Sequence, residues 1–100
     1  MKWIQVAKAN DVPLNTGLSV EAEGKSIALY KVDGKVYAID GICPHAGGPL
    51  AEGNLNGCLA MCPWHGWEFN VKTGLSDFNP DTSTKTFPVK VENDEVFVQI

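Results

Sequence analysis

The chain of 100 residues contains no arginine, and all eight of its basic residues are lysines. Twelve aspartates and glutamates give it a net charge of -4. Proteins that bind nucleic acids present basic patches, usually with guanidinium groups that contact phosphates and bases. The charge balance therefore argues against a nucleic-acid partner.

Long apolar runs are also missing from the chain. No segment approaches the roughly 20 apolar residues that span a bilayer. Residues 1–10 have neither the apolar core nor the small-residue cleavage site of a secretory signal. We therefore expect a cytoplasmic protein without a membrane partner, and the length predicts a single domain over residues 1–100.

Cysteine and histidine are scarce, with three cysteines and two histidines in the chain. An odd number of cysteines does not suit the disulfide framework of a small secreted domain. Cys58 lies in the short apolar run 58–61, where we expect a buried reduced thiol that packs as a small hydrophobic residue. The other two cysteines lie close to the two histidines.

No segment shows a sustained helical period, and glycine, proline and asparagine interrupt the chain about every ten residues, as in many all-β domains. The short runs between them are rich in β-favouring residues. We expect strands at 3–7, 18–22, 26–32, 35–39, 86–91 and 96–100. The pattern predicts an all-β fold.

Three turns are expected between these strands. Asp33-Gly34 is a strong hairpin signal, because a type I′ turn needs positive φ at both central residues. A second turn is expected near Asn93-Asp94, and Asn56-Gly57 marks a third. The third turn separates two loops rich in glycine and proline, so a small hairpin is expected to bring these loops side by side.

These two loops contain both histidines and the remaining two cysteines. The first supplies Cys43 and His45, the second supplies Cys62 and His65, and sixteen residues separate His45 from Cys62. Such short spacings form metal sites because one tight loop can direct two soft ligands at one point. A structural zinc in an interaction module is one alternative. Zinc fingers, however, usually pair Cys with Cys and His with His, whereas each loop here contributes one of each.

The pattern Cys43-x-His45, sixteen residues, then Cys62-x-x-His65 resembles the ligand signature of Rieske iron-sulfur proteins. Neighbouring residues fall where that family places the same types. They are Pro44, Gly47, Pro49, Leu50, Gly53, Pro63, Gly66 and Phe69. The resemblance implies the Rieske fold, a small antiparallel β-sandwich or barrel with a cluster-binding hairpin-and-loop subdomain over about residues 41–69.

The same resemblance implies a [2Fe-2S] cluster as the cofactor. By analogy, Cys43 and Cys62 bind the inner iron, and His45 and His65 bind the outer iron near solvent. With two thiolates the oxidised cluster is neutral, whereas four thiolates would make it a dianion that accepts an electron less readily. Rieske centres accordingly have potentials of roughly -150 to +300 mV, against about -400 mV for plant-type ferredoxins.

The chain departs from the high-potential Rieske proteins of respiratory complexes at four positions. Those proteins carry a disulfide at the places taken here by Gly48 and Trp64, and hydroxyl groups at the places taken by Trp67 and Phe69. Hydroxyl donors to the cluster sulfurs stabilise the reduced form, so their loss lowers the potential. We therefore expect a low-potential centre and not a quinol-oxidising subunit.

The resemblance implies a soluble ferredoxin that is not itself an enzyme. It would carry single electrons from a flavin-dependent reductase to the terminal oxygenase of an aromatic-ring dioxygenase system. The alternative is a Rieske-like small subunit of a larger oxidoreductase, such as nitrite reductase. No residue is assigned a catalytic role in either case.

The histidines are expected at an exposed tip, where a partner protein approaches the cluster. We expect Pro49, Trp64 and the segment 78–80 around this tip. Trp64 either shields the cluster or contacts the partner, and Trp67 is expected to pack in the core.

Overall fold

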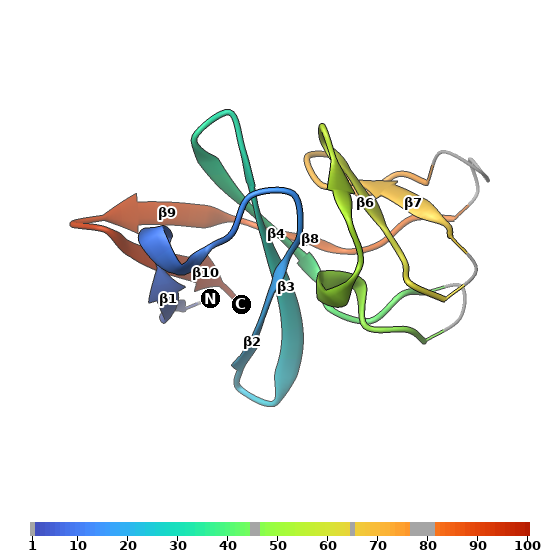
Figure 1. Cartoon of the computed structure of the whole chain (residues 1–100). Helices are drawn as coiled ribbons and strands as arrows, with labels where there is room; N and C mark the ends of the chain where they lie inside the picture. Colours follow the sequence, from blue (N-terminus) through green and yellow to red (C-terminus); the bar gives the residue numbers. More distant parts are fainter. Residues whose placement is uncertain (1, 45–46, 65, 77–81) are drawn as a thin grey trace.

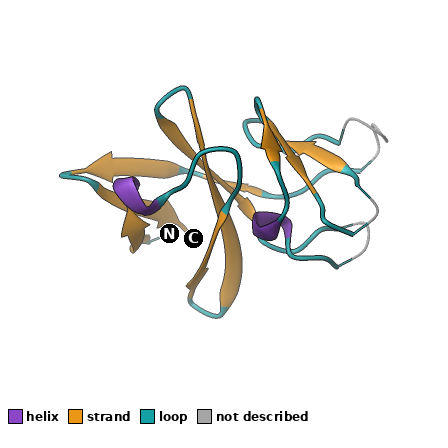
Figure 2. Cartoon of the chain, in the orientation of Figure 1, coloured by secondary structure: helices purple, strands orange, loops and turns teal. Residues whose placement is uncertain are grey.

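The computed structural model describes residues 2–44, 47–64, 66–76 and 82–100, and these are organised almost entirely as β-strands (Figures 1 and 2). The strands are β1 (Trp3–Lys8), β2 (Leu18–Ala22), β3 (Lys25–Val32), β4 (Lys35–Asp40), β5 (Leu55–Asn56), β6 (Leu59–Met61), β7 (Glu68–Asn70), β8 (Thr86–Phe87), β9 (Val89–Glu92) and β10 (Glu95–Gln99). Two short 3-10 helices, η1 (Ala9–Asp11) and η2 (Leu50–Glu52), complete the described elements. Neither they nor any other described segment forms a helix of the length and apolar character needed to cross a bilayer. The all-β prediction is confirmed.

A four-stranded antiparallel sheet, in the order β2-β3-β4-β8, forms the middle of the molecule (Figure 1). Its strand β3 is buried on both faces, because successive side chains of a strand point to opposite sides. Ile27 and Leu29 enter one hydrophobic core, and Ala28 and Tyr30 enter the other. This position explains why residues 27–30 of β3 form a continuous apolar run without alternation.

The first core lies between the middle sheet and the three-stranded sheet β1-β10-β9. Val96 and Val98 of β10 contribute its buried side chains from the outer sheet. The single strand predicted at 86–91 is wrong: Pro88 divides it into β8, in the middle sheet, and β9, in the outer sheet. Proline has no N–H to donate to a ladder, so the chain changes sheets there.

The second core lies on the opposite side of the middle sheet and beneath the small sheet β5-β6-β7. Its largest fully buried side chains include Tyr30, Leu50 and Phe69. Cys43 and Cys62 belong to this core as well. The predicted hairpin and its two loops are therefore built on the second core.

Two of the three predicted turns are confirmed by their backbone angles. Asp33 and Gly34 have φ of 52° and 79°, and Asn93 and Asp94 have φ of 51° and 66°. The third prediction is displaced by one residue: Asn56 pairs with Leu59, so the turn is Gly57-Cys58. Only Gly57 has a positive φ there, of 64°, as in a type II′ turn. Cys58 is consequently half-buried at a turn and not fully buried.

A candidate metal centre formed by two loops

The loop of residues 43–48 is closed by two backbone hydrogen bonds that begin and end at Cys43. The Cys43 N–H donates to the Gly48 carbonyl at 2.8 Å, and the Cys43 carbonyl accepts from the Gly47 N–H at 2.8 Å. Gly47 has φ of 76°, a conformation that residues with side chains rarely adopt. The bridge between Ile42 and Pro49 continues the pairing below the loop. Pro49 therefore lies half-buried at the base of the loop and not at its tip.

The loop of residues 62–67 repeats the same construction. The Cys62 N–H donates to the Trp67 carbonyl at 2.7 Å, and the Cys62 carbonyl accepts from the Gly66 N–H at 3.2 Å. Gly66 has φ of 74°, which matches Gly47 in the first loop. Each cysteine is thus the first residue of a closed turn, with glycine four positions later. This repeated glycine is the signal in the sequence for the loop geometry.

A third loop has the same turn without a cysteine, so the turn itself does not depend on a metal ligand. The Asn70 N–H donates to the Leu75 carbonyl at 2.9 Å, and the Asn70 carbonyl accepts from the Gly74 N–H at 2.7 Å. Gly74 also has positive φ, of 81°. Asn70 occupies the position that a cysteine occupies in the other two loops. Sequence reasoning did not identify this third repeat.

The two cysteines meet at the edge of the second core. Cys43 is 1% exposed and Cys62 is 0% exposed, and both are free thiols. Their side chains are hydrogen-bonded to each other, so the two loops direct their sulfur atoms at one point. No third Cys, His, Asp or Glu joins them among residues 2–44, 47–64, 66–76 and 82–100.

The surroundings of Cys62 control its protonation. Burial raises the pKa of the Cys62 thiol, and the neighbouring Cys43 thiol raises it further. The backbone N–H groups of Trp64 and Gly48 donate to the Cys62 sulfur and act in the opposite direction, because they lower its pKa. An iron ion that replaces the two protons would receive a buried pair of thiolates with backbone donors already in place. The two described cysteines therefore fit a buried iron-sulfur ligand set.

Gly48 is required by space and not by backbone conformation, because its φ is not positive. A Cβ atom at this position would lie 2.9 Å from the Cys62 Sγ and 3.0 Å from two ring carbons of Trp64. Real Cβ atoms essentially never approach so closely without displacing a neighbour. The α-carbon of Gly48 is thus one point at which the first loop contacts the second.

The other predicted residues of the site have different outcomes. Trp67 is partly buried against the second core, as predicted, and Trp64 is 51% exposed. His45, His65 and the segment 78–80 lie outside the described residues, so their roles as ligands and covering loop stay predictions.

Tyr30 is a residue of this core that the sequence did not single out. Its ring is fully buried and its hydroxyl group has no hydrogen-bond partner. Burial raises the pKa of Tyr30 well above its usual value, and the charge of Cys62 adds to the effect. The only signal in the sequence was a phenol at the end of the apolar run 27–30.

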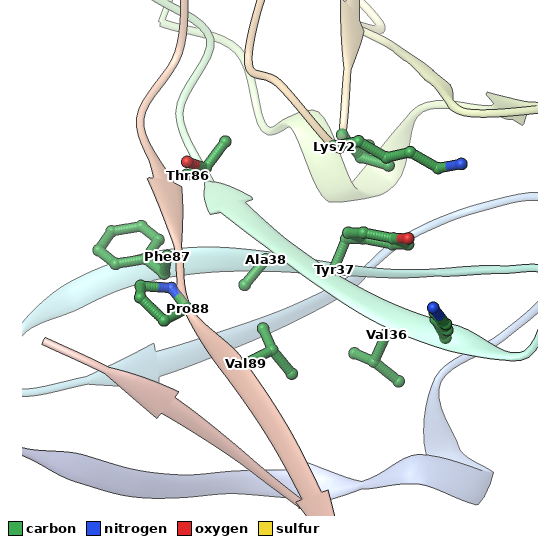
Figure 3. A pocket seen from close by; sticks show the side chains of 10 residues that line it. Val36, Tyr37, Ala38, Lys72, Thr86, Phe87, Pro88 and Val89 are labelled. Atoms are coloured by element: carbon green, nitrogen blue, oxygen red, sulfur yellow. The ribbon is translucent and has the colours of Figure 1, made fainter.

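A groove of about 600 Å³ is lined mainly by residues of β4, β8 and β9 (Figure 3). Lys35 and Lys72 are its charged lining residues, and Val36, Phe87 and Val89 supply apolar surface. Its lining includes no residue of the loops 43–48 and 62–67 as far as the structure describes them. This groove is therefore separate from the cysteine pair.

Comparisons with known proteins agree with this geometry. Residues 2–90 match the family described as "Rieske [2Fe-2S] domain". The ferredoxin component of the naphthalene 1,2-dioxygenase system of Pseudomonas putida is 39% identical, over 100% of this chain and 97% of that protein. The match extends through both cysteine loops and through the strands that support them.

Solved structures show the same relationship. The ferredoxin of Sphingomonas yanoikuyae B1 superposes with a TM-score of 0.91 at 29% identity, over 99% of each chain. A chain from a complex of reduced oxygenase and oxidized ferredoxin in carbazole 1,9a-dioxygenase superposes with a TM-score of 0.87 at 35% identity, over 96% of this chain and 100% of that chain. The small subunit of a putative NADH-dependent nitrite reductase from Mycobacterium tuberculosis reaches a TM-score of 0.89 at only 20% identity, which shows a shared fold alone.

Proposed function

The chain belongs to the Rieske [2Fe-2S] family and binds a [2Fe-2S] cluster, and from this premise we propose that it carries single electrons between proteins. Its electron donor is a flavin-dependent reductase and its acceptor is the terminal oxygenase of an aromatic-ring dioxygenase system. The observation that carries this proposal is the similarity over the whole chain to a ferredoxin component of a naphthalene dioxygenase system. The chain acts as a carrier and not as an enzyme.

The proposed ligands are Cys43 and Cys62 on the inner iron and His45 and His65 on the outer iron. The meeting of two buried thiols at the edge of the second core supports the first pair. The spacing of the histidines within the same two loops supports the second pair. When bound, the cluster supplies the centre that gains and loses one electron.

The potential is proposed to lie at the low end of the Rieske range. Phe69 is fully buried beside the cysteines and has no hydroxyl group to offer to the cluster. All three cysteines are free, so no disulfide joins the two loops. Fewer donors to the sulfurs leave the added negative charge of the reduced cluster less stabilised.

The competing proposal, a small subunit of a nitrite reductase, has weaker support. The solved small subunit from Mycobacterium tuberculosis is 20% identical to this chain, whereas the chain from the complex of oxygenase and ferredoxin is 35% identical. Copurification with a large catalytic partner in stoichiometric amounts would favour the subunit over the carrier. The cytoplasmic location indicated by the sequence stays a prediction.

The function is tested with the cluster-loaded protein, a flavin-dependent ferredoxin reductase and the oxygenase of a dioxygenase system. We expect NADH-driven product formation only when this chain is present, and rapid oxidation of the pre-reduced chain by the oxygenase. Cys43→Ser and Cys62→Ser are expected to lose the cluster spectrum and the transfer together. A loaded protein that neither accepts electrons from a reductase nor reduces an oxygenase would contradict the proposal.

The histidine ligands are tested by the reduction potential as a function of pH. Iron lowers the pKa of the free ring nitrogen, and reduction raises it again because it adds negative charge. We expect a potential that is constant near neutrality and falls at alkaline pH. Voltammetry that found a constant potential into strongly alkaline solution would count against histidine ligation.

A further inference from the structure

Trp64 lies across the junction of the two loops that carry the cysteines. A Cβ atom at Gly48 would be 3.0 Å from the Cγ and the Cδ2 of the Trp64 indole. The indole of the second loop therefore rests on the α-carbon of the first loop. The other part of the ring faces solvent, since the side chain is 51% exposed.

The sulfur of Cys62 shares this contact. The same Cβ position at Gly48 lies 2.9 Å from the Cys62 Sγ, so sulfur, indole and glycine backbone meet at one place. Cys62 is nevertheless 0% exposed, although Trp64 beside it is open to water on one side. The half-exposed indole thus lies beside a sulfur atom that is closed to solvent.

The contact between Trp64 and Gly48 joins two segments that have no covalent link. The backbone hydrogen bonds of residues 43–48 and of residues 62–67 close each loop on itself. All three cysteines of the chain are free thiols. Packing of the indole on Gly48 is therefore one of the contacts that keep the two loops together.

We propose that Trp64 is a positioning residue, whose indole clamps loop 43–48 to loop 62–67 and keeps water from the Cys62 sulfur. The inference rests on the proposed binding of the cluster by Cys62. The clamp slows loss of the cluster, because both loops must separate before the cluster leaves. Exclusion of water also lowers the reduction potential, because water near a ligand sulfur would stabilise the extra negative charge of the reduced form.

The alternative role for an exposed tryptophan beside a redox centre is contact with the partner protein. Aromatic residues are frequent anchors of protein interfaces. An anchor of this kind would change the rate of electron transfer to the partner and leave the potential of the isolated protein unaltered. The two roles are therefore separated by measurements on the protein alone.

The test compares Trp64→Ala, Trp64→Phe and the matched control Trp3→Ala in the cluster-loaded protein. Trp3 is 40% exposed and lies on β1, where its ring contacts Lys90, so the control removes the same side chain from another sheet. The readouts are the rate of bleaching of the cluster absorbance in a chelator and the reduction potential by voltammetry. We expect Trp64→Ala to lose the cluster roughly 10- to 100-fold faster than the control, in the range known for residues behind metal ligands, and its potential to rise.

Trp64→Phe is expected to remain close to the unmodified protein, because it retains a flat ring over Gly48. Gly48→Ala keeps the indole but displaces it. Like Trp64→Ala, it should therefore lose the cluster faster and have a higher reduction potential. If Trp64→Ala cannot be loaded, restoration of a loaded protein by Trp64→Phe supports the clamp and failure to restore it overturns the clamp.

If Trp64→Ala and Trp3→Ala lose the cluster at the same rate and have the same reduction potential, the proposal is overturned. This holds even if Trp64→Ala transfers electrons to the partner protein more slowly. A wrong ligand assignment would appear separately, as a Cys62→Ser protein that keeps the unmodified cluster spectrum.

Discussion

Tyr30 places a buried hydroxyl group without a hydrogen-bond partner in the core beneath the cysteine loops. An unsatisfied buried donor costs about 1–3 kcal/mol of folding free energy. We therefore expect Tyr30→Phe to leave the thermal stability unchanged or to raise it by about 1 kcal/mol, measured by circular dichroism and by bleaching of the cluster. A clear loss of stability together with a lower potential would show instead that the hydroxyl donates to the bound cluster.

The same residue predicts a dependence of stability on alkaline pH. Burial raises the pKa of Tyr30 above the value of about 10 that it has in the unfolded chain. The unfolded state ionises first, so the stabilisation is complete below about pH 10 and is lost as the pH rises further. Tyrosinate absorbance should show Tyr30 ionising only above the ordinary range. Tyr30→Phe should remove this late transition and Tyr37→Phe should retain it. A late transition that survives in Tyr30→Phe would contradict the assignment.

At the scale of elements, the cysteine loops depend on the hairpin that precedes the second loop. Gly53 ends η2, and a Cβ atom at this position would collide with the carbonyl oxygen of Met61 in β6. Its backbone is ordinary, with φ of -87°, so space and not conformation requires glycine. Because Met61 directly precedes Cys62, any displacement there moves the second loop.

Gly53→Ala is accordingly expected to cost about 1–3 kcal/mol through overpacking and to reduce the amount of cluster bound. Gly34→Ala serves as a comparison, because Gly34 has φ of 79° with open space around it. It should cost about 1 kcal/mol through backbone strain and leave the cluster content unaltered. Iron and sulfide analysis with thermal denaturation measures both effects. Equal cluster content in the two variants would show that β6 does not position Cys62.

Over the whole molecule, charge is distributed unevenly along the chain. Between Lys35 and Lys72 there is no lysine, and the acidic residues of this stretch are Asp40, Glu52 and Glu68. The stretch includes η2, the small sheet and both cysteine loops, at the right-hand end of Figure 1. These three carboxylates are the charged groups that this stretch contributes, and a basic partner would be attracted to them.

Electron transfer to such a partner should slow as ionic strength rises, because salt screens the attraction between exposed charges. Glu52→Gln with Glu68→Gln should slow transfer several-fold at low salt and flatten the dependence on salt. Asp94→Asn, in the hairpin turn at the opposite end of the molecule, is the control and should change neither. Stopped-flow measurements of the electron-transfer rate across a salt series test this prediction. If the rate of the unmodified protein does not change with salt, charge does not steer its docking.

The sequence by itself predicts the four candidate ligands, and it determined most of the strands. Two cysteines and two histidines in loops with repeated glycines indicate the cluster, because soft ligands at short spacing suit few other purposes. The turns Asp33-Gly34 and Asn93-Asp94 were predictable because asparagine, aspartate and glycine adopt positive φ more readily than other residues. Local chemistry was sufficient in these cases.

Only the tertiary structure decided what depends on neighbours distant in the chain. The division of 86–91 at Pro88 follows from the position of two sheets, and the turn at Gly57-Cys58 follows from the pairing of Asn56 with Leu59. The contact of Trp64 with Gly48 likewise joins two loops whose order in the chain gives no sign of their distance. Such features arise from packing between elements. Packing depends on residues that are far apart in the sequence, so it cannot be predicted from one position alone.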